Sequence, residues 1–234
     1  MARLARVVVP GEPHHITQRG NHREPVFFND EDYQAYLSLI AAAAQRSGTA
    51  IVSYCLMPNH VHFLMIPTHE DGLRATFAEA HRRYTARIHA RARWTGHLWQ
   101  GRFSSTAMDG RHFLAAAPYV ALNPVRSGLA ARAADWAWSS TRALLAGRDD
   151  GVVTVGPVLA MIPDFAAALE AAEDEVAVMA IRRSRSTGRP VGSVDWIKAL
   201  EAEAGRTLAA GKRGPKAAGS AAGEGDDLFH TVSP

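Results

Sequence analysis

Two histidines, His60 and His62, stand two residues apart inside the apolar run MPNHVHFLMIP at residues 57–67. Side chains alternate across a β-strand, so both imidazoles lie on one face with Cα atoms about 6.5–7 Å apart. Val61, Phe63 and Met65 then point to the opposite face, where helices would cover them. The run is expected to be a strand with a core side and an open side on which the two histidines could converge on one ion.

Two histidines do not complete a metal site. A hard ion such as Mg²⁺ or Mn²⁺ takes further oxygen ligands and keeps waters. The alternative is that His60 and His62 are half-exposed and hydrogen-bonded to their neighbours. The spacing alone leaves both interpretations open, and a third ligand would favour the metal site.

The five tyrosines offer a candidate nucleophile. A nucleophile near a metal benefits from a metal-capable side chain one helical turn away, because residues i and i+4 share a helix face. Only Tyr119 has a polar residue there, Asn123, whereas the other four are followed by Leu37, Ile40, Pro58 and Ile88. The alternative is a core aromatic at Tyr119 and a cap at Asn123 before Pro124.

These residues together make a coherent chemistry. A metal bound by His60, His62 and the Asn123 oxygen would grip a phosphate oxygen and stabilise charge in the transition state. Tyr119 would attack the phosphorus in line with the leaving 3′ oxygen. The products are a 5′-phosphotyrosine link and a free 3′-OH. Because the covalent link conserves the energy of the cleaved phosphodiester bond, the reaction can reverse onto another strand.

The elements that would position these residues follow from periodicity and turn signals. We expect strands at 14–19, 49–57, 60–66 and 101–108, and helices at about 30–46, 71–93 and 110–123, the last stopped by Pro124. Pro58-Asn59 joins the second and third strands as a hairpin. This order predicts an α+β fold with a ferredoxin-like antiparallel sheet and helices packed on one face.

The composition changes after about residue 148. The charge balance is +7 over residues 1–148 and −4 over 149–234, giving the net +3 of the chain. We therefore predict a catalytic domain at 1–148, a small helical C-terminal extension at 149–206 and a disordered tail at 207–234. The arginine-rich first part suits phosphate binding, although a GC-rich genome would also favour arginine. No apolar run is long enough to cross a membrane or act as a signal peptide, so we expect a cytoplasmic protein.

Several stretches together resemble a known family. SYCLMPNHVHFLM, QGRFSS and YVALNPVRSGL, with HHITQRGNHREPVFF near the N-terminus, resemble the REP-associated tyrosine transposases of the HUH single-tyrosine superfamily, over about residues 5–145. The resemblance implies His60 and His62 as metal ligands, Tyr119 as nucleophile and Asn123 as a further ligand. It also implies Mg²⁺ or Mn²⁺, and single-stranded DNA beside a hairpin as substrate. We expect a monomer or a homodimer.

The DNA contacts expected first are polar residues near this site. They are Arg19, Asn21, Gln100, Arg102 and Arg126. Trp94, Trp99 and Phe103 could stack on unpaired bases or pack in the core. Arginines recur at 83, 87 and 91 and could follow a phosphate backbone or form a solvated helix face.

Two departures from the family pattern bear on function. Pro118 precedes Tyr119 and could kink its helix, so one alternative is a catalytically weak single-stranded or hairpin DNA-binding protein on the same fold. The stretch at 185–206 resembles a C-terminal segment of many relatives, but the basic tract after it, GKRGPK at 211–216, is short. A histidine-triad hydrolase ranks low because position 64 is Leu rather than a third histidine.

Overall fold

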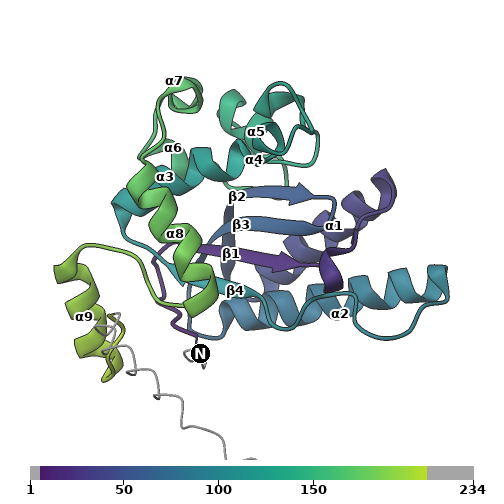
Figure 1. The fold of residues 1–234 in the computed structure, drawn as a ribbon, viewed down its shortest axis with the longest axis horizontal. Helices are drawn as coiled ribbons and strands as arrows, with labels where there is room; N and C mark the ends of the chain where they lie inside the picture. Colours follow the sequence, from purple (N-terminus) through teal and green to yellow (C-terminus); the bar gives the residue numbers. More distant parts are fainter. Residues whose placement is uncertain (1–5, 210–234) are drawn as a thin grey trace, which may run out of the picture.

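The computed structural model describes residues 6–209 of the chain. Its centre is a four-stranded antiparallel sheet in the order β2-β3-β1-β4 (Figure 1). The strands are β1 His14–Arg19, β2 Thr49–Met57, β3 His60–Pro67 and β4 Ser104–Ala107. This is the ferredoxin-like order that the element pattern predicted, with the histidine strand in the interior of the sheet.

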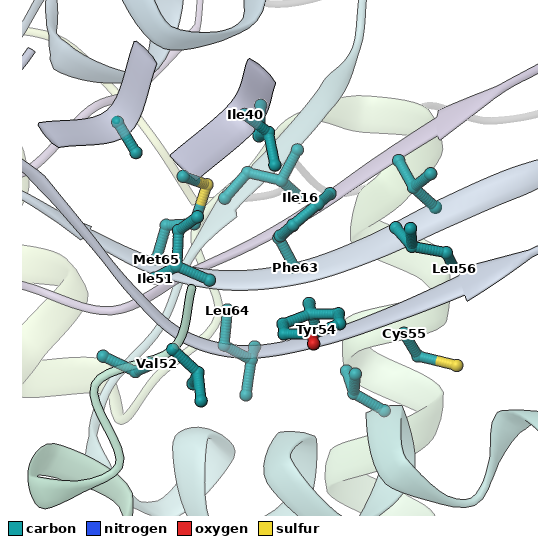
Figure 2. Packing of buried hydrophobic residues seen from close by; sticks show 14 of the residues in the cluster. Ile16, Ile40, Ile51, Val52, Tyr54, Cys55, Leu56, Phe63, Leu64 and Met65 are labelled. Atoms are coloured by element: carbon teal, nitrogen blue, oxygen red, sulfur yellow. The ribbon is translucent and has the colours of Figure 1, made fainter. Parts of the chain in front are cut away.

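Two long helices, α1 Asp30–Arg46 and α2 Gly72–Ala92, pack against one face of the sheet. Helix α1 begins as expected, because the Asn29 side chain accepts a hydrogen bond from the Asp32 N–H. Phe63 and Met65 of β3 lie on the side of the strand that faces Ile40 of α1, whereas Leu64 lies on the other side (Figure 2). The predicted division of β3 into two faces is confirmed.

The second face of the sheet, which carries the histidines, is covered in part by α3 Gly110–Ala121 and α8 Glu175–Thr187 (Figure 1). The sequence led us to expect an open face there, and this expectation is wrong for His62, which is 1% exposed. The reason is long-range packing: both helices follow β3 in the chain and return to this face.

The remaining helices are short. They are the 3₁₀ turns η1 Asn21–Arg23 and η2 Ala133–Asp135, and the helices α4 Asn123–Arg126, α5 Thr141–Ala146, α6 Gly156–Leu159, α7 Phe165–Glu170 and α9 Val194–Ala204. The helix expected to end at 123 ends at Ala121, and Pro124 lies in the first turn of α4 rather than stopping the structure.

The C-terminal extension is helical, as the sequence predicted, and its first part shares the central core. Phe165 of α7 and Val178 and Ile181 of α8 belong to the same buried cluster as the sheet. Helix α9 packs separately on the N-terminal segment, where Leu200 contacts the cluster around Val7. The tail predicted for 207–234 and the tract at 211–216 lie, apart from 207–209, outside the described residues. Among residues 6–209, no helix is both long and apolar enough to span a bilayer.

Candidate active site

The register of β1 and β3 places the histidines beside a row of polar side chains. Thr17 of β1 lies opposite His62, and Arg19 lies opposite His60. Directly paired residues of antiparallel strands share a face, so these four side chains lie on the face covered by α3 and α8. The ring centroids of His60 and His62 are 5.0 Å apart. The prediction that both imidazoles share one face is confirmed.

One nitrogen of each imidazole is held by a neighbour. Nδ1 of His62 is 2.9 Å from Nε2 of His15, and Nδ1 of His60 is 2.7 Å from Oδ1 of Asn59. Nε2 of each ring is left for another partner. Orienting a histidine through one nitrogen while the other binds an ion is the usual arrangement at metal sites.

The histidines are neutral at physiological pH. Burial lowers the pKa of His60 to about 4, with Arg19 and Arg185 adding to the effect. Burial likewise holds the pKa of His62 well below its usual value, assisted by the neighbouring imidazoles. The neutral imidazole is the form that binds a metal, so burial prepares both rings as ligands.

Tyr119 reaches this face from α3. Its ring stands edge-on to the rings of both His62 and His15, with centroids 6.0 Å apart in each case. Arg126 lies over the Tyr119 ring, 4.6 Å from the centroid, and also donates to the Tyr119 carbonyl and pairs with Glu173. The structure thus brings together the tyrosine and the histidine pair that the sequence singled out.

Asn123 lies one turn after Tyr119 and is buried. Its Nδ2 donates to the carbonyl of Tyr119 at 2.8 Å and to that of Val120 at 3.3 Å. These bonds leave Oδ1 as the available ligand atom.

The donor set fits a hard divalent ion that also takes oxygens from substrate or water. It consists of two neutral imidazoles, His60 and His62, and one amide oxygen from Asn123. In the described part of the chain, no three His, Cys, Asp or Glu side chains are grouped as a metal site. The amide and non-protein oxygens would therefore be needed to complete the coordination.

Pro118 does not interrupt α3. The Leu122 N–H donates to the Pro118 carbonyl at 2.9 Å, and the helix runs through the proline to Ala121. Tyr119 therefore still faces His62.

A groove of about 640 Å³ runs from His60 between β1, the loop before β4, and α8. Three of the predicted DNA contacts, Arg19, Gln100 and Arg102, line it. Gly101 lies between the last two with a φ of +58°, a conformation that side chains with a Cβ rarely adopt. The lining contains five arginines and no carboxylate, so the groove is positively charged.

The other two predicted DNA contacts lie elsewhere. Asn21 lines a separate hollow of about 220 Å³ together with the exposed Trp94 and Phe28. Arg126 is engaged by Glu173 and the Tyr119 carbonyl, a geometry that favours positioning of the tyrosine over contact with DNA.

Core packing accounts for Trp99 and Phe103, and ion pairs account for two arginines of the α2 row. Trp99 is buried and stacks on His81 with centroids 4.4 Å apart, and Phe103 packs on Phe77 at 4.6 Å. In the arginine row of α2, Arg91 pairs with Asp32 at 2.5 Å and Arg83 with Glu79 at 3.6 Å. These ion pairs favour a surface role for the row over a phosphate track.

Sequence reasoning missed His15 as a site residue. Its alternation with Thr17 and Arg19 was the available signal, because the three must share a face. It also missed the arginines that α8 brings to the groove. No local signal predicts that a helix more than a hundred residues after β3 returns to this face.

Residues 12–123, just under half of the chain, match the sequence model of the family described as "Transposase IS200 like". The segment contains His60, His62, Tyr119 and Asn123.

The fold is shared with a solved transposase structure. The structure of the REP-associated tyrosine transposase bound to a REP hairpin is 22% identical, with a TM-score of 0.54, covering 66% of this chain and 90% of that one. A structure from Deinococcus radiodurans R1, described as a proposed transposase, is also 22% identical, with a TM-score of 0.37, covering 51% of this chain and 95% of that one. No curated protein matches this chain significantly in sequence.

Proposed function

We propose that this protein is a metal-dependent DNA endonuclease and strand transferase that cleaves and rejoins single-stranded DNA through a 5′-phosphotyrosine intermediate. The observation that carries the proposal is the convergence of Tyr119 on the paired histidines, with the rings of Tyr119 and His62 6.0 Å apart. The match of residues 12–123 to the IS200-like transposase family supports the same reaction class.

The chain's own residues have distinct tasks in this proposal. His60, His62 and Asn123 would hold Mg²⁺ or Mn²⁺, which when bound supplies Lewis-acid stabilisation of charge on the phosphate oxygens. The Tyr119 oxygen forms a bond to phosphorus as the bond to the 3′ oxygen breaks. The phenol gives up its proton and the departing 3′ oxygen gains one, so the charges balance. Arg126 holds Tyr119 in place through its carbonyl and ring.

The proposed substrate is single-stranded DNA next to a REP-like hairpin. This extends to the present chain what the similar transposase structure contains, a bound REP hairpin. Arg19, Gln100 and Arg102 along the groove are the proposed contacts to the strand, and Asn21 in the neighbouring hollow is a further one. We place the reaction in the cytoplasm, with the protein acting as a monomer or a homodimer.

The test is formation of a covalent adduct. The protein is incubated with a single-stranded DNA that carries a hairpin, in the presence of Mg²⁺ or Mn²⁺, and the protein–DNA adduct is resolved on a denaturing gel. We expect an adduct with the wild type and none with Tyr119→Phe. The matched control is Tyr33→Phe, since Tyr33 lies on α1 and stacks on Phe27 and Trp138 away from the histidines.

An adduct that survives Tyr119→Phe would overturn the assignment of the nucleophile. Tight binding of the hairpin DNA without an adduct under either ion would favour the alternative of a DNA-binding protein that no longer cleaves.

A further inference from the structure

We propose that Arg182 and Arg185 of α8, in the C-terminal extension, bind the phosphates of the single strand that enters the active site. The inference rests on the proposed function, because it names the part of the chain that holds the strand beside Tyr119. It makes the extension a working part of the catalytic groove.

The chain fixes α8 on the histidine face through buried contacts. Val178 and Ile181 are buried, one helical turn apart, against the central core. The Ser184 hydroxyl lies 2.8 Å from the Thr106 hydroxyl of β4, and the Ser104 hydroxyl donates to the Arg185 carbonyl at 2.8 Å. The backbone that carries the two arginines is therefore bound to the sheet.

Arg182 and Arg185 are three residues apart, so they share a helix face, and both line the groove that begins at His60. The Arg182 guanidinium carbon lies 5.2 Å from the centroid of the Tyr119 ring. The pair thus stands between the nucleophile and the groove.

The charges of the groove lack internal partners. Within residues 6–209, none of its five arginines forms an ion pair: Arg19, Arg23, Arg102, Arg182 and Arg185. Elsewhere arginines such as Arg46, Arg91 and Arg132 are paired with carboxylates. Five unpaired guanidinium groups around one hollow repel each other, so an anion that bridges them would stabilise the arrangement.

A strand of DNA fits this charge better than a small anion. The lining includes His60, Gln100 and Arg102 along a groove of about 640 Å³, and Arg182 of the same lining reaches the Tyr119 ring. Successive phosphates of a single strand can occupy such a row, because the backbone carries one charge per nucleotide. Arg182, which lies over the Tyr119 ring, would bind at the phosphate that is cleaved, and Arg185 at its neighbour.

The experiment compares binding of single-stranded DNA by two double variants of the full chain. Arg182→Gln with Arg185→Gln removes the proposed contacts. The charge-matched control is Arg148→Gln with Arg183→Gln, because Arg183 is exposed on the same helix but does not line the groove, and Arg148 is exposed beyond α5. Binding is measured by fluorescence anisotropy over a range of salt concentrations, with EDTA present and Tyr119→Phe in every protein, so that no cleavage intervenes.

We expect the Arg182/Arg185 variant to bind the single strand about tenfold more weakly. The slope of the logarithm of its association constant against the logarithm of the salt concentration should be shallower by about 1.4, at about 0.7 per lost phosphate contact. The control should keep the slope of the protein that carries Tyr119→Phe alone. Equal behaviour of the two variants would overturn the inference. So would an equal loss on a blunt hairpin without a single-stranded flank, because the arginines would then contact the stem.

The outcome separates this inference from the proposed reaction. Adduct formation by the wild type, with the two variants binding equally well, would retain the reaction and reject the role of α8. Binding that depends on Arg182 and Arg185, without any adduct, would retain the role of α8 and reject cleavage. A wild type that binds no single-stranded DNA would reject both.

Discussion

A hydrogen bond between His15 and His62 links the tautomers of the two imidazoles. If His62 binds an ion through Nε2, its Nδ1 carries the proton and donates to Nε2 of His15, 2.9 Å away. His15 must then carry its own proton on Nδ1, an atom that is buried without a hydrogen-bond partner in the described part of the chain. An unpartnered buried donor costs about 1–3 kcal/mol. In this arrangement the unpaired Nδ1–H of His15 is the cost of holding His62 in the tautomer that could bind a metal through Nε2.

The first prediction concerns this bond. His15→Phe removes the acceptor for the His62 Nδ1–H, so we expect Mn²⁺ to bind about 10–100-fold more weakly, the usual effect of losing such an orienting partner. Calorimetric titration of the DNA-free protein with Mn²⁺ measures this without relying on activity.

His14→Phe is the matched control for that variant. His14 is buried on the same strand but lies on the opposite face, where it bonds to the N-terminal segment through Val9 and Glu12. Unchanged Mn²⁺ affinity in His14→Phe, beside a loss in His15→Phe, is the expected result. Equal losses would show that the metal site responds to any disturbance of β1.

At the scale of single residues, the sequence predicted those that follow a local rule. His60 and His62 follow from strand alternation, and Tyr119 with Asn123 from helical spacing. Arg126 shows the limit of this reasoning. Its proximity to Tyr119 was predictable, but its ion pair with Glu173, 47 residues later, was not.

Helix α8 is held on β4 by a buried pair of hydroxyls. Thr106 is 0% exposed, and its hydroxyl has Ser184 as its hydrogen-bond partner, whereas Ser184 also donates to the Ile181 carbonyl. Removing the Ser184 hydroxyl therefore leaves Thr106 unsatisfied in the interior. The pair is a point at which the attachment of α8 can be tested.

We predict that Ser184→Ala lowers the free energy of unfolding by about 1–3 kcal/mol, because the Thr106 hydroxyl loses its partner. Adding Thr106→Val should restore most of the stability, since neither side then buries an unsatisfied polar group. Urea unfolding of the single and double variants measures both effects. A double variant less stable than Ser184→Ala would mean that the Thr106 hydroxyl has another role.

At the scale of elements, the sequence predicted what local patterns determine and missed what depends on long-range packing. The β2–β3 hairpin and α1 were predictable because alternation, the Pro58-Asn59 turn and the Asn29 cap are written in adjacent residues. Strand β4 was expected at 101–108 and extends over Ser104–Ala107, because only this part pairs with β1. The placement of α8 depends on residues far apart in the chain and could not be predicted.

Several histidines are buried or partly buried in the described part of the chain. Besides the site residues, His14 lies in the sheet, and His81 of α2 bonds to the Tyr36 hydroxyl at 3.0 Å. Burial lowers the pKa of His14 and His60 to about 4 and of His15 and His81 to about 3, and lowers that of His62 as well. The folded protein therefore keeps all five rings neutral at a pH where the unfolded chain binds protons.

This imbalance predicts acid sensitivity of the whole fold. Below about pH 6.5 the unfolded chain takes up protons that the folded protein refuses until about pH 4, so stability is full above pH 6.5 and falls as the pH drops. Each such histidine contributes up to about 1.4 kcal/mol per pH unit, and domains are stable by only about 5–15 kcal/mol. Five histidines acting together should unfold the protein before pH 4 is reached.

Urea unfolding of the metal-free protein between pH 7.5 and 5 tests this expectation. The free energy of unfolding should stay level above about pH 6.5 and fall below it. His81→Gln removes one titrating ring far from the proposed metal site. The decline of the free energy of unfolding with falling pH should therefore become less steep by about 1.4 kcal/mol per pH unit. His69→Gln, at an exposed histidine in the loop before α2, is the control for the substitution itself. A midpoint that stays constant from pH 7 to 5 would mean that the buried rings take up protons without unfolding, and that solvent reaches them in the native state.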